Sequence, residues 1–229
     1  MKIIFVAGTD TDAGKTLVTG LLADYLNRHG YRVVTQKWVQ TGDNTSNDID
    51  IHLRLMGKEK KDFVHHLKLM QPYGFKAACS PHLAARLSRK KISLTKIKKS
   101  TEKLAKDFDF VIIEGIGGLF TPLNEKTVLI DLVQTMRLPV LLVAANKLGV
   151  INHTLLSLEA LKARKIHLIG TIFNNLSSKE KKYILNDNPQ IVGTLGRTKI
   201  LGTLPYKKNI SNIQKYFRSI GKQILSQYE

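Results

Sequence analysis

Cysteine and tryptophan each occur only once in the 229 residues, and there are only six prolines. The single cysteine, Cys79, excludes a disulfide within the chain, which is the usual condition of a protein in the reducing cytoplasm. No apolar run approaches the roughly 20 residues that a membrane-spanning helix needs. The apolar run at residues 2–7 leads directly into a glycine-containing loop, so we expect a core strand there and not a secretion signal. The composition therefore favours a cytoplasmic protein without a membrane partner.

Acidic residues are also scarce, because 18 Asp and Glu stand against 36 Lys and Arg and give a net charge of +18. A basic surface attracts phosphate backbones whatever their base sequence. The lysines, however, lie in dispersed clusters, such as those within residues 58–61 and 96–99, without the aromatic residues that stack on bases. This pattern is typical of solvated helix faces, so we expect no specific nucleic-acid partner.

Hydrophobic residues make up 43% of the chain, enough for one sizeable core. Short apolar, β-branched runs alternate with amphipathic segments, and neither repeats nor low-complexity linkers interrupt them. This alternation predicts a single α/β domain over residues 1–229, with a doubly wound, mainly parallel sheet flanked by helices. The expected strands cover residues 2–7, 31–36, 110–113, 140–145, 168–173 and 199–204.

A loop with the composition of a phosphate-binding loop follows the first expected strand and makes the predicted domain P-loop NTPase-like. Its sequence is Gly8-Thr9-Asp10-Thr11-Asp12-Ala13-Gly14-Lys15-Thr16. Backbone N–H groups at a helix N-terminus bind phosphate oxygens, Lys15 would reach the terminal phosphates, and the Thr16 hydroxyl would bind Mg²⁺. Five residues separate Gly8 from Gly14, whereas the generic motif has four. A strand-to-helix turn that binds nothing is the alternative interpretation.

Polar residues follow other expected strands, and in a parallel sheet those strand ends meet at one edge. Lys37 follows the second strand, and Glu114 begins a Gly-rich segment where an acidic group would hold Mg²⁺. Asn174 ends another strand and offers the donor and acceptor that an adenine edge needs. The alternatives are a Gly-rich turn with an incidental Glu and ordinary Asn turn chemistry. Asp48 and Asp50 are both candidate metal carboxylates, with helix capping as the other interpretation.

Residues 58–81 are the least interpretable part of the sequence. The adjacent His65 and His66 have no third ligand nearby at a metal-like spacing, so surface or packing roles are favoured. Farther along the chain, Ser177 and Glu180 form a capping-box pattern that predicts a helix start. Ser211 is expected to open a C-terminal helix.

Four separated motifs together resemble those of dethiobiotin synthetases, the ATP-dependent carboxylases of biotin synthesis. They are the loop of residues 8–16 with the family's own spacing, residues 37–42, residues 114–118 with 120–123, and residues 147–153. Ser80-Pro81-His82 and Pro205-Tyr206 extend the resemblance over nearly the whole chain. The resemblance implies a ligase that forms a ureido ring from 7,8-diaminononanoate, CO₂ and ATP with Mg²⁺ in a homodimer.

The resemblance also implies roles for individual residues of this sequence. It assigns catalysis to Lys37, Lys15 and Thr11, substrate binding to Lys37, Thr41 and Asn152, and metal binding to Thr16, Asp48 and Glu114. The implied ATP-binding residues are Asp12, Ala13, Gly14, Lys15, Thr16, Leu17, Asp48, Glu114, Gly115, Ile116, Gly117, Asn174, Asn175, Pro205, Tyr206 and Lys207. The family pattern favours Asp48 over Asp50.

Three positions depart from the family pattern. Trp38 replaces the proline that usually follows the catalytic lysine, Thr41 stands where serine is common, and Asn209 falls near an acidic ribose contact of some members. The main alternative function is a nucleotide switch like the partition and division-site ATPases, which bind DNA or membranes. Those proteins carry an additional early lysine in the phosphate loop, where Thr9 and Asp10 stand here. A related ATP-dependent amide-forming enzyme is disfavoured because the chain has no glutaminase-like Cys/His module.

Overall fold

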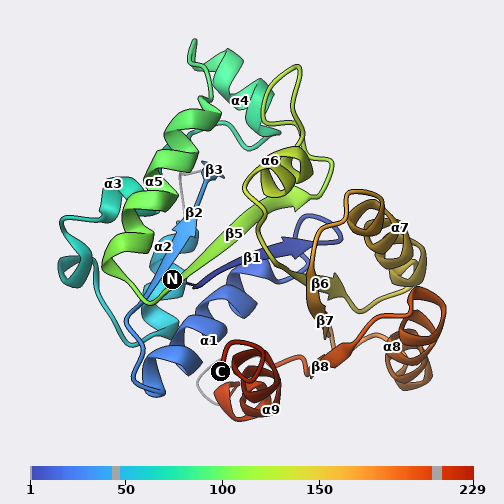
Figure 1. Ribbon diagram of the computed structural model, residues 1–229. Coiled ribbons are helices and arrows are strands. Elements are labelled where there is room, and N and C mark those ends of the chain that lie inside the picture. Colours follow the sequence, from blue (N-terminus) through green and yellow to red (C-terminus); the bar gives the residue numbers. More distant parts are fainter. Residues whose placement is uncertain (1, 43–46, 208–212) are drawn as a thin grey trace.

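A parallel six-stranded sheet with the order β2-β5-β1-β6-β7-β8 forms the centre of the fold (Figure 1). The computed structural model describes residues 2–42, 47–207 and 213–229. The strands of this sheet are β1 (Lys2–Gly8), β2 (Val33–Lys37), β5 (Phe110–Gly118), β6 (Val140–Ala145), β7 (Leu168–Asn174) and β8 (Ile200–Leu204). The apolar runs of the sequence thus form the predicted doubly wound sheet.

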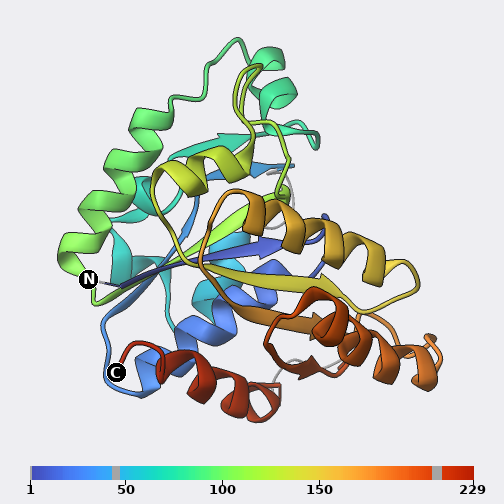
Figure 2. The same cartoon turned by 45° about the vertical axis from the view of Figure 1, so that its right-hand side comes forward.

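Helices cover both faces of the sheet. In both views α1 and α9 lie below the sheet, and α6 and α7 lie above it (Figures 1 and 2). The longer helices are α1 (Lys15–Arg28), α2 (Asp48–Leu55), α5 (Leu94–Asp107), α7 (Val150–Ala163), α8 (Lys182–Gly196) and α9 (Gln214–Leu225). The shorter ones are α3 (Leu67–Met70), α4 (Pro81–Leu87), α6 (Leu129–Thr135) and the 3₁₀ helix η1 (Lys60–Phe63). Among the described residues, no helix combines the length and apolar character needed to cross a bilayer.

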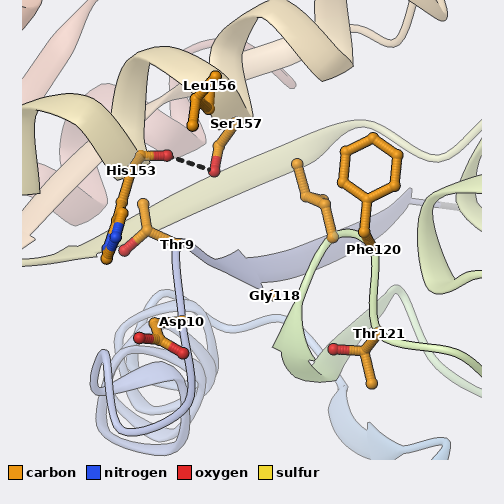
Figure 3. A pocket seen from close by; sticks show the side chains of 9 residues that line it. Thr9, Asp10, Gly118, Phe120, Thr121, His153, Leu156 and Ser157 are labelled. Atoms are coloured by element: carbon orange, nitrogen blue, oxygen red, sulfur yellow. Dashed lines mark hydrogen bonds between the residues drawn. The ribbon is translucent and has the colours of Figure 1, made fainter.

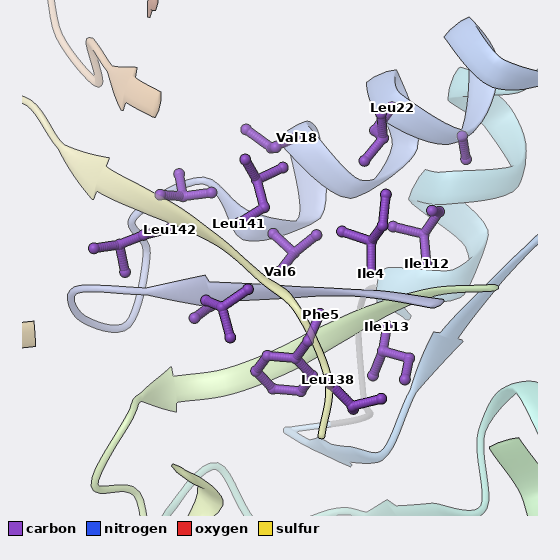
Figure 4. Packing of buried hydrophobic residues seen from close by; sticks show 14 of the residues in the cluster. Ile4, Phe5, Val6, Val18, Leu22, Ile112, Ile113, Leu138, Leu141 and Leu142 are labelled. Atoms are coloured by element: carbon purple, nitrogen blue, oxygen red, sulfur yellow. The ribbon is translucent and has the colours of Figure 1, made fainter. Parts of the chain in front are cut away.

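The core lies on both sides of the central strands. Ile4 and Val6 of β1 point toward the α1 side, where Val18 and Leu22 pack, while Phe5 points to the opposite side (Figure 4). β6 is buried along its whole length. Strands of a parallel sheet are covered by helices on both faces, which explains their continuous apolar sequence.

The strand register brings the polar strand ends to one edge. β5 lies between β1 and β2, and Glu114 pairs with Val6 on one side and with Lys37 on the other. Gly8, at the start of the loop, pairs with Gly118. Lys37 and Glu114, 77 residues apart in sequence, are therefore direct neighbours across two strands.

Several local predictions differ from the structure. A second, two-stranded parallel sheet joins β3 (Val39–Thr41) to β4 (Tyr73–Phe75), and no pattern in the sequence predicts it. The predicted helix start at Ser177 is wrong, because α8 begins only at Lys182 and the Ser177 hydroxyl accepts a hydrogen bond from the Lys179 N–H in a local turn. Ser211, expected to open the last helix, lies outside the described residues.

Candidate active site

A cavity of about 460 Å³ opens at the edge of the sheet where the polar strand ends meet. The phosphate loop, β2, β3, α2 and the end of β5 all contribute to its wall. Its lining includes Thr11, Asp12, Gly14, Lys15, Thr16, Leu17, Lys37, Thr41, Asp48, Glu114, Ile116 and Gly117. The structure thus brings together the predicted catalytic residues, the predicted metal ligands and Thr41.

The phosphate loop wraps around the Lys15 side chain. Asp12 and Gly14 have positive φ angles of 57° and 95°, which turn the backbone tightly before α1 begins. Lys15 Nζ donates a hydrogen bond of 2.8 Å to the Asp10 carbonyl oxygen, so the ammonium lies inside the loop. Burial, followed by repulsion from Lys37, lowers the pKa of Lys15 to about 8. The loop therefore already carries a cation at the position where phosphate would bind.

Lys37 is held by two carboxylates at the bottom of the cavity. Its Nζ lies 2.6 Å from Glu114 Oε1 and 2.8 Å from Asp48 Oδ2, and it also donates to the Gly115 carbonyl oxygen. Burial alone would lower the pKa of Lys37, but the charges of Glu114 and Asp48 outweigh burial and raise it. Lys37 is therefore a positive charge at neutral pH and not a base.

Three side chains with oxygen atoms that could bind a metal lie together beside Lys37: those of Thr16, Asp48 and Glu114. Thr16 Oγ1 lies 3.0 Å from Glu114 Oε1 and 3.2 Å from Asp48 Oδ1. Burial would raise the pKa of Glu114, but the Lys37 charge and a hydrogen bond from His52 hold it at about 2, so the carboxylate is ionised. Asp50 does not line the cavity and forms an exposed ion pair with Lys60. Of the two candidate aspartates, Asp48 is the one at the site.

This donor set matches the chemistry that Mg²⁺ prefers. Two carboxylates and one hydroxyl are hard oxygen ligands, and Mg²⁺ in nucleotide sites takes its other ligands from phosphate and water. No group of three His, Cys, Asp or Glu side chains within the described ranges is arranged to hold a metal without such help. The three side chains would therefore suit a Mg²⁺ ion that also takes phosphate and water ligands.

The predicted adenine-binding residues lie beside this cavity. Asn174 Nδ2 donates to the Ala13 carbonyl oxygen of the phosphate loop at 3.2 Å. The Asn175 side chain accepts from Asn146 Nδ2 at 2.8 Å, which ties the ends of β6 and β7 together. Residues 205–207 follow β8, whose Leu204 pairs with Asn174, so they lie at the same sheet edge. The predicted metal, phosphate and adenine contacts thus follow one another along this edge.

Asn152 lies apart from the residues above. It is exposed on the first turn of α7 and lines neither this cavity nor the neighbouring one. The neighbouring cavity, about 410 Å³, runs from Thr9 and Asp10 of the loop to Leu156 and Ser157 of α7 (Figure 3). The structure therefore does not bring Asn152 together with the other predicted site residues.

One buried residue of the site has no counterpart in the sequence interpretation. His52 of α2 is completely buried, and its Nε2 lies 2.8 Å from Glu114 Oε2. His66, by contrast, packs against Phe108 and bonds Asp107, as expected for a surface histidine. The available signal for His52 was its spacing of four residues from Asp48, which places both on one helix face.

Comparisons with known proteins identify the relatives of this chain. A family model described as an AAA domain matches residues 2–214. An ATP-dependent dethiobiotin synthetase from Haemophilus influenzae is 43% identical over 174 residues, covering 76% of this chain and 91% of the relative. One from Lysinibacillus sphaericus is 38% identical over 224 residues, covering 94% of this chain and 92% of the relative.

Solved structures with a similar fold are more distant in sequence. The cell division ATPase MinD of Pyrococcus furiosus has a TM-score of 0.63 at 18% identity and covers 99% of both chains. The ParA protein of pNOB8, solved with nonspecific DNA, has a TM-score of 0.58 at 14% identity. At such identities the likeness shows the P-loop NTPase fold alone. The sequence relatives are much closer, and the chain belongs to the ATP-dependent dethiobiotin synthetase family.

Proposed function

We propose that the protein converts 7,8-diaminononanoate, CO₂ and ATP into dethiobiotin, ADP and phosphate. The observation that carries the proposal is the convergence of Lys15 and Lys37 with Glu114 at one sheet edge, in a chain of the synthetase family. Every intermediate of such a reaction is an anion, so a site with two buried cations suits it. The protein's task is then to position reactants and to neutralise charge.

The chemistry proceeds in three steps. One amine of the substrate attacks CO₂ and loses a proton, which gives a carbamate. A carbamate oxygen then attacks the γ-phosphorus of ATP, and ADP leaves. The second amine attacks the carbonyl carbon of this mixed anhydride, and phosphate leaves as the ring closes. Lys15 and Lys37 stabilise the carbamate and the transferring phosphoryl group, while the hydroxyls of Thr11 and Thr41 donate hydrogen bonds.

Magnesium is part of this proposal. Thr16, Asp48 and Glu114 would hold the ion, which supplies Lewis-acid stabilisation of the phosphate oxygens when bound. We assign the phosphates to the loop amides, and the adenine to Asn174 and Asn175 with residues 205–207. A cytoplasmic location belongs to the same proposal, since ATP and a reducing environment suit a chain whose single cysteine has no partner cysteine.

A homodimer is proposed from the surface around α7. Phe120, Leu148 and Leu156 are large apolar side chains that are mostly exposed. Figure 3 shows Phe120 and Leu156 on opposite walls of the cavity that leads to Thr9 and Asp10 of the phosphate loop. Exposed apolar groups gathered around a cavity are typical of interaction sites. A two-fold interface there would allow Asn152 to reach the partner's substrate.

The dimer proposal predicts the effect of a charge on α7. Leu156→Glu is expected to convert a dimer into a monomer, because a carboxylate desolvated at the interface costs several kcal/mol. Light scattering after size exclusion measures the change, and carboxylation should fall with it. Leu87→Glu is the matched control, since Leu87 is 64% exposed on α4 and Leu156 is 62% exposed. A Leu156→Glu protein that stays dimeric would contradict the proposed interface.

Fixation of labelled CO₂ tests the proposed reaction. Incubation of the protein with the diamine, MgATP and ¹⁴C-bicarbonate is expected to give acid-stable label in equimolar amount to ADP. The label becomes acid-stable only when the ring closes, because a free carbamate loses CO₂ in acid. Omission of the diamine is the control. ATP turnover without trapped label would remove the synthetase proposal, and ATP-dependent, salt-sensitive DNA binding would favour the nucleotide switch instead.

A further inference from the structure

His52 reaches the cavity from behind, on the same face of α2 as Asp48. The two residues are four positions apart, so one helical turn separates them and both face the end of β5. α2 lies unusually close to α1 at Gly20, where an added Cβ would be 3.3 Å from the His52 Cα. This close approach brings the imidazole to the sheet edge, where it is completely buried.

The two oxygens of Glu114 have separate partners. Oε2 lies 2.8 Å from His52 Nε2, whereas Oε1 faces Lys37 Nζ at 2.6 Å and Thr16 Oγ1 at 3.0 Å. An ionised carboxylate only accepts hydrogen bonds, so the imidazole must donate its Nε2–H. With Oε2 engaged behind the site, the carboxylate cannot rotate without breaking this bond. The oxygen that remains toward the phosphate loop is Oε1.

The other ring nitrogen supports a role beyond packing. Within the described part of the chain, His52 Nδ1 is buried and has no hydrogen-bond partner. A buried polar atom without a partner has lost its hydrogen bonds to water and gained none, so an apolar residue would pack here at lower cost. The hydrogen bond from Nε2 to Glu114 is therefore the interaction that favours a histidine at this position.

We propose that His52 is a positioning residue that fixes the Glu114 carboxylate so that Oε1 faces the metal and phosphates. This inference rests on the proposed Mg²⁺ site of the preceding section. His52 acts through Glu114 and touches neither nucleotide nor substrate. Outer partners of ligating carboxylates have a measurable effect, because they hold the ligand in its binding orientation before the ion arrives.

A pair of variants separates positioning from packing. His52→Leu removes the donor and keeps apolar bulk, whereas His52→Gln keeps an N–H donor at a similar distance from the backbone. The measured quantity is the affinity of Mn²⁺ for the protein–ADP complex, read from water-proton relaxation without turnover. We expect about 10- to 100-fold weaker Mn²⁺ binding in His52→Leu and recovery of most of that loss in His52→Gln. ADP affinity in EDTA should change by less than about twofold in both.

The controls use the same helix. Asp50→Asn alters an exposed carboxylate of α2 that does not line the cavity, and it should leave Mn²⁺ affinity unchanged. Thermal unfolding of each variant shows that the comparison concerns folded protein. Equal Mn²⁺ affinities for His52→Leu and the unmodified chain would overturn the proposal. An equal loss in the Leu and Gln variants, or a parallel loss of metal-free ADP affinity, would also overturn it.

This test is independent of the identity of the substrate. If the unmodified chain binds Mn²⁺ with ADP but traps no labelled CO₂, the proposed reaction fails while the role of His52 is still measured. If label is trapped and the His52 variants bind Mn²⁺ normally, the reaction stands and the positioning role fails. In the active enzyme, His52→Leu should lower kcat about 10-fold or more, with a smaller change in the KM of the diamine.

Discussion

Lys37→Ala is expected to lower turnover by two or more orders of magnitude while the protein stays folded. Removing one preorganised electrostatic group from an active site typically costs about 10² to 10³ in kcat. Lys37 is such a group, because it is 4% exposed and is held between Glu114 and Asp48. Steady-state phosphate release with the diamine present measures the loss. Circular dichroism and thermal unfolding report whether the variant folds.

The fold is expected to survive because Glu114 keeps other partners. His52 Nε2 and Thr16 Oγ1 still contact its carboxylate after Lys37 is removed. Lys60→Ala is the matched control, since Lys60 also pairs with a carboxylate of α2, Asp50, but on the exposed surface. Surface ion pairs contribute at most about 1 kcal/mol, so this variant should keep full activity. Near-normal turnover in Lys37→Ala would refute its catalytic role.

The sheet was predictable from the sequence for a physical reason. Strands buried on both faces require continuous apolar residues, and β6 was predicted at the bounds that the structure shows, residues 140–145. Right-handed crossovers then place the carboxyl ends of parallel strands at one edge. From that rule we expected Lys37 and Glu114 to lie at the same edge of the sheet. The register between β2 and β5 pairs them directly.

The β3–β4 sheet was not predictable by the same reasoning. Each strand has only three residues, too few for a recognisable alternation, and more than 30 residues separate the partners in sequence. The missed start of α8 has a different cause. Ser177 and Glu180 have capping-box spacing, but Ser177 closes a two-residue turn instead of capping a helix. A spacing pattern cannot show which N–H a hydroxyl will bind.

The side-chain hydrogen-bond networks behind the site could not be predicted from the sequence either. The Trp38 ring is buried against Phe5, and its Nε1 donates to Gln36 Oε1. Thr101 of α5 donates to the same oxygen at 2.7 Å. Such networks depend on which side chains of different helices and strands come into contact, and sequence patterns do not show this. The contact between His52 and Glu114 was not predicted for the same reason. Both Trp38 and His52 adjoin predicted site residues, in sequence or one turn along a helix.

Gly14→Ala is expected to weaken ADP binding by at least about tenfold. The Gly14 backbone has a φ of 95°, and an L-residue in a left-handed conformation costs about 1–2 kcal/mol. An added Cβ would also collide with the Asn174 side chain, which is buried and bonded to the Ala13 carbonyl oxygen. Either the loop or Asn174 must move, and both belong to the proposed nucleotide site. ADP can bind only after these groups return to their original positions, and a cost of about 1.4 kcal/mol for that return corresponds to a tenfold loss of affinity.

Gly30→Ala is the control that separates the loss of stability caused by backbone strain from the loss of ADP affinity caused by a disturbed phosphate loop. Gly30 has a similar φ of 87°, it follows α1 at the end opposite the phosphate loop, and an added Cβ there would meet nothing within 4 Å. Both variants should lose stability through the same left-handed strain, of about 1–2 kcal/mol. Only Gly14→Ala should lose ADP affinity, measured by calorimetry at a temperature where both proteins are folded. Equal ADP affinities in the two variants would mean that the loop does not hold the phosphates, because the clash with Asn174 occurs in only one of them.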